Sequence, residues 1–290
     1  MAMPKHINNV IFMAVFSFLF MLEIFCKYII FYSDICTMVR AKKYLGQHFL
    51  TDVSIAARIA GALKNEADFP VLEIGPGTGV LTRELVKRNF KNLTLVEIDT
   101  ESVEYLKDNF DNSKFNLLEA DFLKMDLESF CDSEMCIIGN FPYNISSQIF
   151  FKALENRAKV SEIVCMIQKE VAERIASKEG SKVYGILSVL MQLYYRCEYL
   201  FTVHEHVFNP PPKVKSGVVR FVRYRSAMDG VDEKKLFMVV KTAFNQRRKT
   251  LRNSLKSMLT PEVDMSHRFW NLRPEQLSPE EFVELTKLLK

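Results

Sequence analysis

The sequence is poor in the residues and patterns that mark fibrous, disordered and repeat proteins. Its 290 residues include 10 Gly and 10 Pro, too few for a collagen-like or low-complexity chain. We find no internal repeat and no compositionally biased tract. With 48% hydrophobic and 26% charged residues, the chain has a globular composition. Its length fits one large domain, or a large domain with a small appendage.

Cysteine is sparse and lacks the spacing of a metal site. The chain has no CxxC pair and no His at ligand distance from a Cys. Most cysteines lie in apolar runs, as in EIVCMIQ, which favours buried, reduced thiols. We therefore expect neither a bound metal nor a disulfide framework from the six residues Cys26, Cys36, Cys131, Cys136, Cys165 and Cys197.

The longest uncharged apolar run, residues 10–22, is shorter than a membrane span. A spanning helix needs about 20 apolar residues, and extending this run to residue 32 places Glu23 and Lys27 inside it. No small-x-small cleavage site follows. From Met38 the composition becomes basic and globular. We expect residues 1–37 to be an apolar leader from a misassigned start, with a membrane anchor at 10–32 or a packed helix as the alternatives.

Positive charge is concentrated in one part of the chain. The total formal charge is only +4, yet residues 210–260 hold 13 Lys and Arg against three acidic residues. This segment carries a net +10 and the rest of the chain −6. Such asymmetry indicates that the segment contacts a polyanion, although a solvated helical face would have the same composition.

Short apolar runs alternate with amphipathic stretches over residues 53–167. Strands are predicted at 71–74, 93–98, 116–119, 136–138 and 163–167, and helices at 53–63, 81–87, 102–107 and 147–154. This order predicts an α/β fold with a parallel, doubly wound, Rossmann-like sheet. After residue 212 we expect a strand at 214–224 and helices at 234–244 and 246–257. A last helix is expected to begin with Ser278 as N-cap, Pro279 and a returning Glu281. The predicted domains are 38–225 and 226–290.

A glycine-rich turn follows the first predicted strand, with Gly75, Gly77 and Gly79 in the pattern GxGxG. It differs from the GxGxxG of dinucleotide enzymes and from the phosphate-binding P-loop. Glu97 ends the next strand, where a carboxylate can accept both hydroxyls of a ribose. Alternation places Asp99 on the same side, so spacing does not choose between these two. Acids at successive strand ends favour a nucleoside-containing cofactor.

Two further strand ends complete this predicted site. Asp121 ends the third strand, where it could accept from an adenine amino group. The fourth strand runs into Asn140-Phe141-Pro142-Tyr143. The Asn140 side-chain carbonyl and the Phe141 backbone carbonyl can accept from an exocyclic amine, while Tyr143 stacks on a flat ring. The alternative is a proline turn with a core tyrosine.

Together these motifs resemble the N6-adenine methyltransferase signature in the form found in rRNA adenine dimethyltransferases. The resemblance runs from about residue 39 to the C-terminus. KYLGQHFL (43–50) is similar to the family's opening motif, VFNPPPKVKS (207–216) to its late loop, and FNQRRKTL (244–251) to the basic helix of its small C-terminal domain. The family uses S-adenosylmethionine on a Rossmann-like sheet. The implied cofactor contacts are His48, Leu50, Gly75, Gly77, Glu97, Asp121 and Asn140.

The resemblance also implies a catalytic group and an RNA surface. Asn140, Phe141, Pro142 and Tyr143 would hold the target adenine, which Phe208 of the late loop would approach. His48 stands where relatives often have Asn, and Phe141 where Leu is commoner. Basic residues of the late loop and the C-terminal part would engage rRNA phosphates, namely Lys213, Lys215, Arg247, Arg248, Lys249 and Arg252.

Within the family, the small-subunit branch is the most similar. It dimethylates two adjacent adenosines in the 3′-terminal hairpin loop of 16S rRNA within an immature small ribosomal subunit. This implies a cytoplasmic enzyme with a role in ribosome biogenesis and no metal. The alternatives are a 23S rRNA adenine dimethyltransferase, a non-catalytic RNA-binding assembly factor, and a membrane-associated enzyme anchored through residues 10–32.

Overall fold

The computed structural model describes residues 39–64 and 69–289. The described residues from Ala41 onward form one compact unit. The expected leader and its alternative as a membrane anchor lie outside the described residues. Within the described ranges, each helix is too short or too polar to traverse a bilayer.

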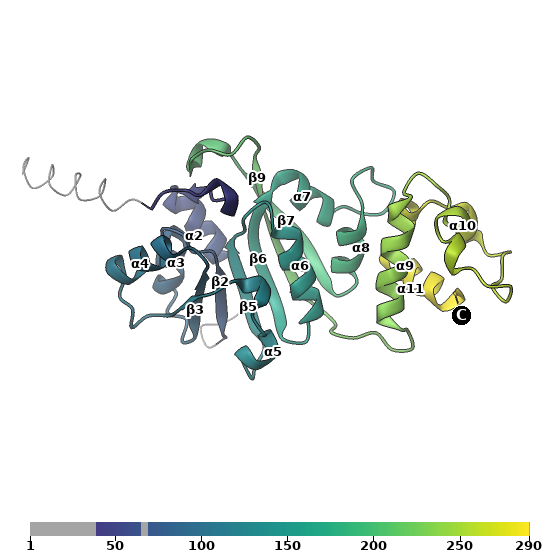
Figure 1. Ribbon diagram of the computed structural model, residues 1–290, viewed down its shortest axis with the longest axis horizontal. Coiled ribbons are helices and arrows are strands. Elements are labelled where there is room, and N and C mark those ends of the chain that lie inside the picture. The colour runs from purple at the N-terminus through teal and green to yellow at the C-terminus, as the bar shows by residue number, and fades with distance from the viewer. Residues whose placement is uncertain (1–38, 65–68, 290) are drawn as a thin grey trace, which may run out of the picture. The chain divides into compact units, whose positions relative to one another are not determined.

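The fold alternates strands and helices through most of its length (Figure 1). The strands are β1 (Phe49–Leu50), β2 (Val71–Ile74), β3 (Leu93–Glu97), β4 (Asn116–Glu119), β5 (Met135–Asn140), β6 (Val160–Gln168), β7 (Tyr195–Val203), β8 (Phe208–Asn209) and β9 (Ser216–Arg223). The α-helices are α2 (Val53–Gly61), α3 (Val80–Lys87), α4 (Thr100–Asn109), α5 (Leu127–Phe130), α6 (Ser146–Glu155), α7 (Lys169–Ile175), α8 (Ile186–Gln192), α9 (Glu233–Asn245), α10 (Leu251–Ser254) and α11 (Pro279–Leu288).

In the described part of the chain, seven strands form the central sheet in the order β4-β3-β2-β5-β6-β9-β7. The pairs among β4, β3, β2, β5 and β6 are all parallel. The expected Rossmann-like α/β architecture is therefore confirmed. The sheet is mixed rather than wholly parallel, because β9 lies between β6 and β7 and runs antiparallel to both. β7 was missing from the predicted elements, although its sequence YRCEYLFTV alternates in polarity along much of its length.

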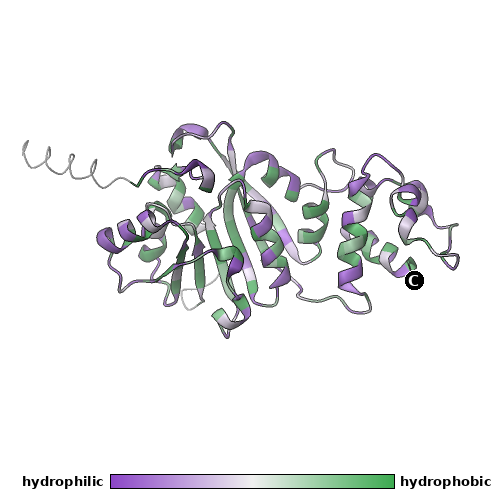
Figure 2. Cartoon of the chain, in the orientation of Figure 1, coloured by the Kyte–Doolittle hydropathy of each residue, from purple (hydrophilic) through white to green (hydrophobic). Residues whose placement is uncertain are grey.

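Alternating side chains of the buried strands supply two separate cores. On β5, Ile137 packs in the cluster that includes Phe150 of α6, whereas Cys136 and Ile138 pack in the cluster that includes Ile59 of α2. Successive residues of a strand point to opposite faces, so strands buried on both sides read as continuous apolar runs. Figure 2 shows this as hydrophobic strands between helices whose outer faces are hydrophilic. The sheet is thus covered on both faces, as a doubly wound fold requires.

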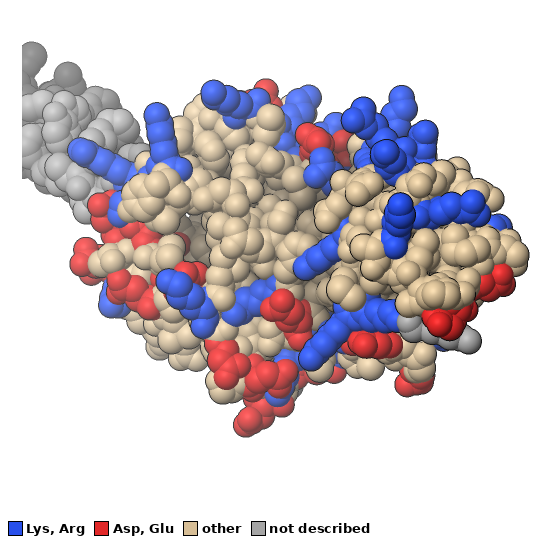
Figure 3. All heavy atoms as spheres, turned by 45° about the vertical axis from the view of Figure 1, so that its right-hand side comes forward, with Lys and Arg blue, Asp and Glu red and all other residues tan. Residues whose placement is uncertain are grey.

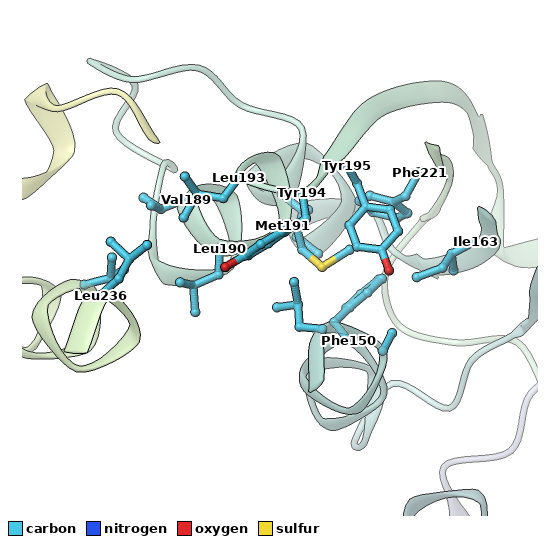
Figure 4. Packing of buried hydrophobic residues seen from close by; sticks show 14 of the residues in the cluster. Phe150, Ile163, Val189, Leu190, Met191, Leu193, Tyr194, Tyr195, Phe221 and Leu236 are labelled. Carbon is cyan, nitrogen blue, oxygen red and sulfur yellow. The ribbon is translucent and has the colours of Figure 1, made fainter. Parts of the chain in front are cut away.

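The helices after residue 225 share their buried cluster with the sheet. Leu236 of α9 and Leu190 of α8 belong to the same cluster as Phe221 of β9, and Figure 4 shows these side chains in one region. The N-terminus of α11 has the predicted capping box, with Ser278 accepting from the Glu281 amide and Glu281 accepting from the Ser278 amide. The predicted domain division at residue 225 stays a prediction.

The predicted helix at 246–257 is helical only in its second half, in α10 and a short 3-10 turn at Lys256–Met258. The α9 helix ends at Asn245, and residues 246–249 form turns in which the Lys249 amide donates to the Gln246 carbonyl at 2.8 Å. The short α10 then begins at Leu251, whose amide donates to the Leu272 carbonyl at 2.8 Å. Two buried leucines, Leu251 and Leu255, fix this second direction. Helical periodicity continued through the sequence, but tertiary packing divides the segment.

Candidate active site

The candidate site lies where the carboxyl ends of parallel strands meet. The chain forms β3 and β4 on one side of β2 and then returns to place β5 on the other side. Loops leaving β2 and β5 therefore diverge, which opens a crevice at their carboxyl ends. A cavity of about 240 Å³ occupies this place.

The cavity gathers most of the predicted cofactor and substrate residues. Its lining includes His48, Gly75, Gly77, Glu97, Asp121, Asn140, Phe141, Pro142 and Tyr143. Leu50 is buried beside it and lines a smaller neighbouring hollow together with Gly75 and Asn140. Five segments of the sequence thus converge on one cavity.

The glycine turn has backbone angles that favour glycine. Gly75, Gly77 and Gly79 have φ of 65°, 55° and 73°. A Cβ on Gly75 would meet no atom within 4 Å, so a side chain there would enter open space where Gly75 lines the cavity. A Cβ on Gly77 would lie 2.8 Å from the Phe49 ring. The turn therefore leaves room for a ligand at Gly75 and for the Phe49 ring at Gly77.

Glu97 is the acid that joins the glycine turn to the cavity. It is 4% exposed, and its carboxylate accepts from the Gly77 amide at 3.0 Å and from the Ile98 and Asp99 amides at 2.8 and 2.9 Å. Burial raises the pKa of Glu97, although the three amides oppose the rise. The Ile98 and Asp99 amides both donate to Oε1, whereas Oε2 accepts only from Gly77 and keeps acceptor capacity for a ligand hydroxyl.

Asp99 has a different partner set and does not line the cavity. Its carboxylate forms an ion pair with Lys42 and accepts from Gln47 at 3.2 Å and Ser102 at 3.1 Å. Burial would raise the pKa of Asp99, but the Lys42, Gln47 and Ser102 hydrogen bonds outweigh it and lower the pKa. The structure thus separates two acids that spacing could not distinguish. Lys42 and Gln47 were missed in this role, because their partner lies more than 50 residues away.

Asp121 and Ile98 face the same cavity from neighbouring strand ends. One Asp121 oxygen accepts from the Leu123 amide at 3.0 Å, and the other lies 3.5 Å from the Lys124 ammonium. Ile98 is 51% exposed, which is unusual for a large apolar residue beside a polar turn. An exposed apolar side chain that lines the cavity together with Glu97 and Asp121 suits one face of a flat heterocycle. Its position directly after Glu97 was the available sequence signal.

The Asn140 amide has a defined orientation. Its Nδ2 donates to the His48 carbonyl at 2.9 Å, so Oδ1 is left as an acceptor at the cavity. The His48 ring places Nδ1 at 2.8 Å from the Pro210 carbonyl. A carbonyl can only accept, so Nδ1 carries the proton in this arrangement. Two hydrogen bonds therefore link the opening motif to the end of β5 and to the late loop.

The aromatic residues of this motif have separate places. Phe141 is 1% exposed and its ring packs edge-on to Phe150, while its amide donates to the Met166 carbonyl at 3.0 Å. Tyr143 lines the cavity, and its ring centroid lies 5.5 Å from that of His48. Burial raises the pKa of the Tyr143 hydroxyl, which therefore stays protonated near neutral pH.

Phe208 is placed apart from the cavity. It is 4% exposed, belongs to the same buried cluster as Leu50, and pairs with it through the two-stranded sheet of β1 and β8. Contact of this ring with a base stays a prediction, and it would require the ring to leave its buried position.

The predicted RNA-binding residues fall into two groups. Five are exposed and form no ion pair within the described part of the chain, namely Lys213, Lys215, Arg248, Lys249 and Arg252. Arg247 instead donates to the Ser181 carbonyl at 3.2 Å and lies 3.9 Å from the Glu275 carboxylate. Its half-buried side chain holds the loop before α8 against the C-terminal part.

Several other cations of the basic segment are also used within the fold. Arg220 pairs with Glu198, Arg223 with Glu134, and Arg225 with Glu280. The charge counted from the sequence therefore overstates what is free to meet a polyanion. In the view of Figure 3, Lys and Arg still gather in the upper and right-hand parts of this face, whereas Asp and Glu lie mainly toward the lower edge. The described residues contain no group of three or more His, Cys, Asp or Glu placed to hold a metal ion.

Comparison with known proteins identifies the family of this chain. A family model described as ribosomal RNA adenine dimethylase matches residues 38–289. The chain belongs to this family. The assignment makes it an S-adenosylmethionine-dependent rRNA adenine dimethyltransferase. The family match begins at the residue where the sequence turns basic and globular.

Relatives and solved structures of this dimethylase family cover most of the chain. A protein of Phocaeicola vulgatus named ribosomal RNA small subunit methyltransferase A is 55% identical over 251 residues, 86% of this chain and 89% of that one. A protein of the same name from Cytophaga hutchinsonii is 53% identical over 252 residues, which is 87% of this chain and 98% of that one.

Two solved structures of related enzymes have the same fold. A dimethyladenosine transferase from Plasmodium falciparum superposes with a TM-score of 0.69 at 25% identity, covering 82% of this chain and 96% of its own. The 23S rRNA methyltransferase ErmE superposes with a TM-score of 0.64 at 26% identity, and the match covers 82% of this chain and 99% of that one.

Beneath the glycine turn, a buried carboxyl group generates a pH-dependent prediction. Glu73 of β2 is 1% exposed and accepts from the Thr82 hydroxyl at 2.8 Å. Burial raises its pKa from 4.5 to about 8, and the nearby Glu97 charge adds to the rise. Because the pKa is higher in the folded protein, the stability from burying the neutral acid is complete below pH 4.5. It is lost as the pH rises toward about 8.

Glu73→Gln keeps an acceptor for Thr82 and removes the titration. We expect its free energy of unfolding, relative to that of the wild type, to improve by about 1.4 kcal/mol per pH unit across this window. Urea unfolding at several pH values measures the difference. The surface change Glu104→Gln is the control. A difference that does not vary with pH would show that Glu73 is ionised throughout.

The Lys42–Asp99–Gln47 cluster generates a second prediction. Asp99→Asn weakens the hydrogen bonds that hold the opening segment, residues 42–50, against the end of β3. Losing a charged hydrogen bond should accelerate amide hydrogen exchange in this segment by about ten-fold. Exchange measured by mass spectrometry checks this, with Asp111→Asn in an exposed loop as the control. Equal protection in both variants would mean that other contacts hold the segment.

Proposed function

We propose that this enzyme adds two methyl groups to N6 of each of two adjacent adenosines in the 3′-terminal hairpin loop of 16S rRNA. The substrate would be an immature small ribosomal subunit in the cytoplasm, and the modification would serve subunit biogenesis. The observation that carries the proposal is the orientation of Asn140, whose Oδ1 is left as an acceptor in the cavity that also contains Glu97.

S-adenosylmethionine fits the groups that line this cavity. Glu97 would accept from a ribose hydroxyl through Oε2, and Asp121 would accept from the adenine amine. Ile98 would cover one face of that adenine, while Gly75 leaves space for the cofactor backbone. His48 and Leu50 would bound the methionine end. When bound, the cofactor supplies an electrophilic methyl group on sulfur.

The remaining residues suit an exocyclic amine as the acceptor. The lone pair of adenine N6 is delocalised into the ring, so the nitrogen is a weak nucleophile. Acceptance by Asn140 Oδ1 and the Phe141 carbonyl would draw it toward tetrahedral geometry, while Pro142 fixes the turn and Tyr143 stacks on the base. N6 becomes acidic as it is alkylated, and its proton can leave to water.

The choice of rRNA rests on the curated relatives. The proteins named for the small subunit match at 53–55% identity, whereas the structure of a 23S rRNA methyltransferase matches at 26%. The FNQRRKTL segment supports the same choice. Intact Glu97, Asp121 and Asn140 argue against a non-catalytic assembly factor, because a scaffold has no need of an oriented acceptor in a cavity.

Dimethyladenosine mapping tests the reaction and its site. We expect mass spectrometry of 16S rRNA to find the adjacent pair in wild-type cells and to find it unmodified in cells that lack this protein. A gene encoding Asn140→Ala should fail to restore it, because N6 loses one of its two acceptors. The gene encoding Asn156→Ala, an asparagine outside the cavity, should restore it. A modified pair in the deletion strain would refute the assignment, and modified 23S rRNA would favour the large-subunit alternative.

The exposed cations generate a binding prediction. Replacing Arg248, Lys249 and Arg252 together with Ala should weaken rRNA binding and reduce its log–log salt slope by about two to three units, because each phosphate contact releases counterions. Filter binding across a salt series measures this. The control removes equal charge at exposed Lys107, Lys114 and Lys287.

Arg247→Ala should behave differently from its neighbours. The substitution should lower the thermal unfolding midpoint and have little effect on the salt slope of rRNA binding, because the Arg247 side chain is already used within the fold. If the salt slope of rRNA binding is unchanged when Arg248, Lys249 and Arg252 are replaced together, these three residues do not contact rRNA.

A further inference from the structure

A buried serine at the start of β9 contacts the hydroxyl of the proposed stacking tyrosine, Tyr143. The Tyr143 hydroxyl and the Ser216 Oγ are 2.6 Å apart, although 73 positions separate the two residues. Ser216 is 0% exposed. The pair joins the end of the Asn140–Tyr143 motif to Ser216, which is both the last residue of the late loop and the first residue of β9.

The position of Ser216 is fixed by the strands around it. It is paired with Gln168 of β6 on one side and with Val203 of β7 on the other. The next residue, Gly217, packs so closely that a Cβ there would lie 2.8 Å from the Ala172 side chain and 2.9 Å from the Tyr199 ring. Ser216 therefore presents its hydroxyl from a rigid site. Tyr143 is held at its backbone by the motif and at its hydroxyl by this strand.

The two methyl transfers place unequal demands on this ring. In each transfer the carbon–sulfur bond breaks to give the thioether product, a nitrogen–carbon bond forms, and the N6 proton passes to water. Adenine N6 begins with two N–H groups, which can satisfy both Asn140 Oδ1 and the Phe141 carbonyl. N6-methyladenine has one N–H and can satisfy only one of these acceptors. Orientation of the base in the second transfer then depends more on the stacked ring.

We propose that Ser216 is a positioning residue that acts through the Tyr143 hydroxyl and favours the second methyl transfer over release of the monomethylated product. The inference rests on the proposed dimethylation of rRNA adenine. It assigns a role to the end of the late loop, where the sequence pointed only to Phe208 and the lysines.

The test is the product distribution with unmodified small-subunit particles and S-adenosylmethionine. Purified wild-type protein should yield mainly dimethyladenosine. Ser216→Ala should lower the rate ratio of the second to the first transfer by about three- to five-fold, as expected for one lost hydrogen bond, so that N6-methyladenosine accumulates. Time courses read by nucleoside mass spectrometry give both rates. Tyr143→Phe keeps the ring and should produce the same shift.

The double variant separates positioning from general destabilisation. If Ser216 acts through the tyrosine hydroxyl, Ser216→Ala combined with Tyr143→Phe should have the ratio of either single variant. The controls are Ser254→Ala, another buried serine, and Tyr195→Phe, which removes a buried hydroxyl bonded to the Val160 carbonyl at 3.0 Å. They should leave the ratio unchanged even if their unfolding midpoints fall.

Three outcomes would overturn the inference. Equal slowing of both transfers in Ser216→Ala would assign the serine a structural role only. Additive effects in the double variant would mean that Ser216 does not act through the Tyr143 hydroxyl. The same change in rate ratio in a control variant would mean that the change arises from lower stability of the fold. Failure of the wild-type protein to transfer any methyl group would refute the proposed function itself.

Discussion

The hydrogen bond from Asn140 to the His48 carbonyl is the contact on which the geometry of the site depends. It directs the Nδ2 end of the amide toward the opening segment and leaves Oδ1 as an acceptor for a ligand. It also ties the opening segment to the carboxyl end of β5. Because the donor belongs to a side chain and the acceptor to a backbone, a different residue at position 48 can maintain it. This explains how a His can occupy a position where the resemblance leads one to expect Asn.

Three acids around the glycine turn have three different environments. Glu73 lies in the sheet beside one hydroxyl donor, and burial favours its neutral form. Glu97 is nearly as buried but receives three backbone amides, which partly oppose the rise in its pKa. Asp99 is paired with a lysine, and its pKa is lowered. One short region thus contains a core acid whose neutral form burial favours, an acceptor that lines the cavity and an ion-paired anchor, and donor supply rather than residue type distinguishes them.

The sequence was informative wherever a signal was local. The positions of β2, β3 and β4, the glycine turn and the Ser278 cap follow from periodicity and from neighbouring residues, and so does the set of acids at strand ends. It was uninformative where a partner comes from far along the chain. Lys42 and Gln47 are ordinary polar residues until Asp99 is placed beside them, and Ser216 is one of several serines until Tyr143 reaches it. The insertion of β9 between β6 and β7 is likewise a non-local choice, as is the break between α9 and α10.

The basic segment shows the same limit for electrostatics. Charge counting treats every cation as equivalent, but a cation paired with a carboxylate contributes little net field to a partner, and one that donates to a carbonyl within the fold is not free to contact a phosphate. Arg247 and Arg248 are adjacent in sequence, yet one is directed into a contact between loops and the other into solvent. The division arises because α9 ends at Asn245 and the following turns place successive side chains in different directions. An RNA surface is therefore defined by the cations that the fold leaves unpaired, and the turns after α9 determine which cations those are.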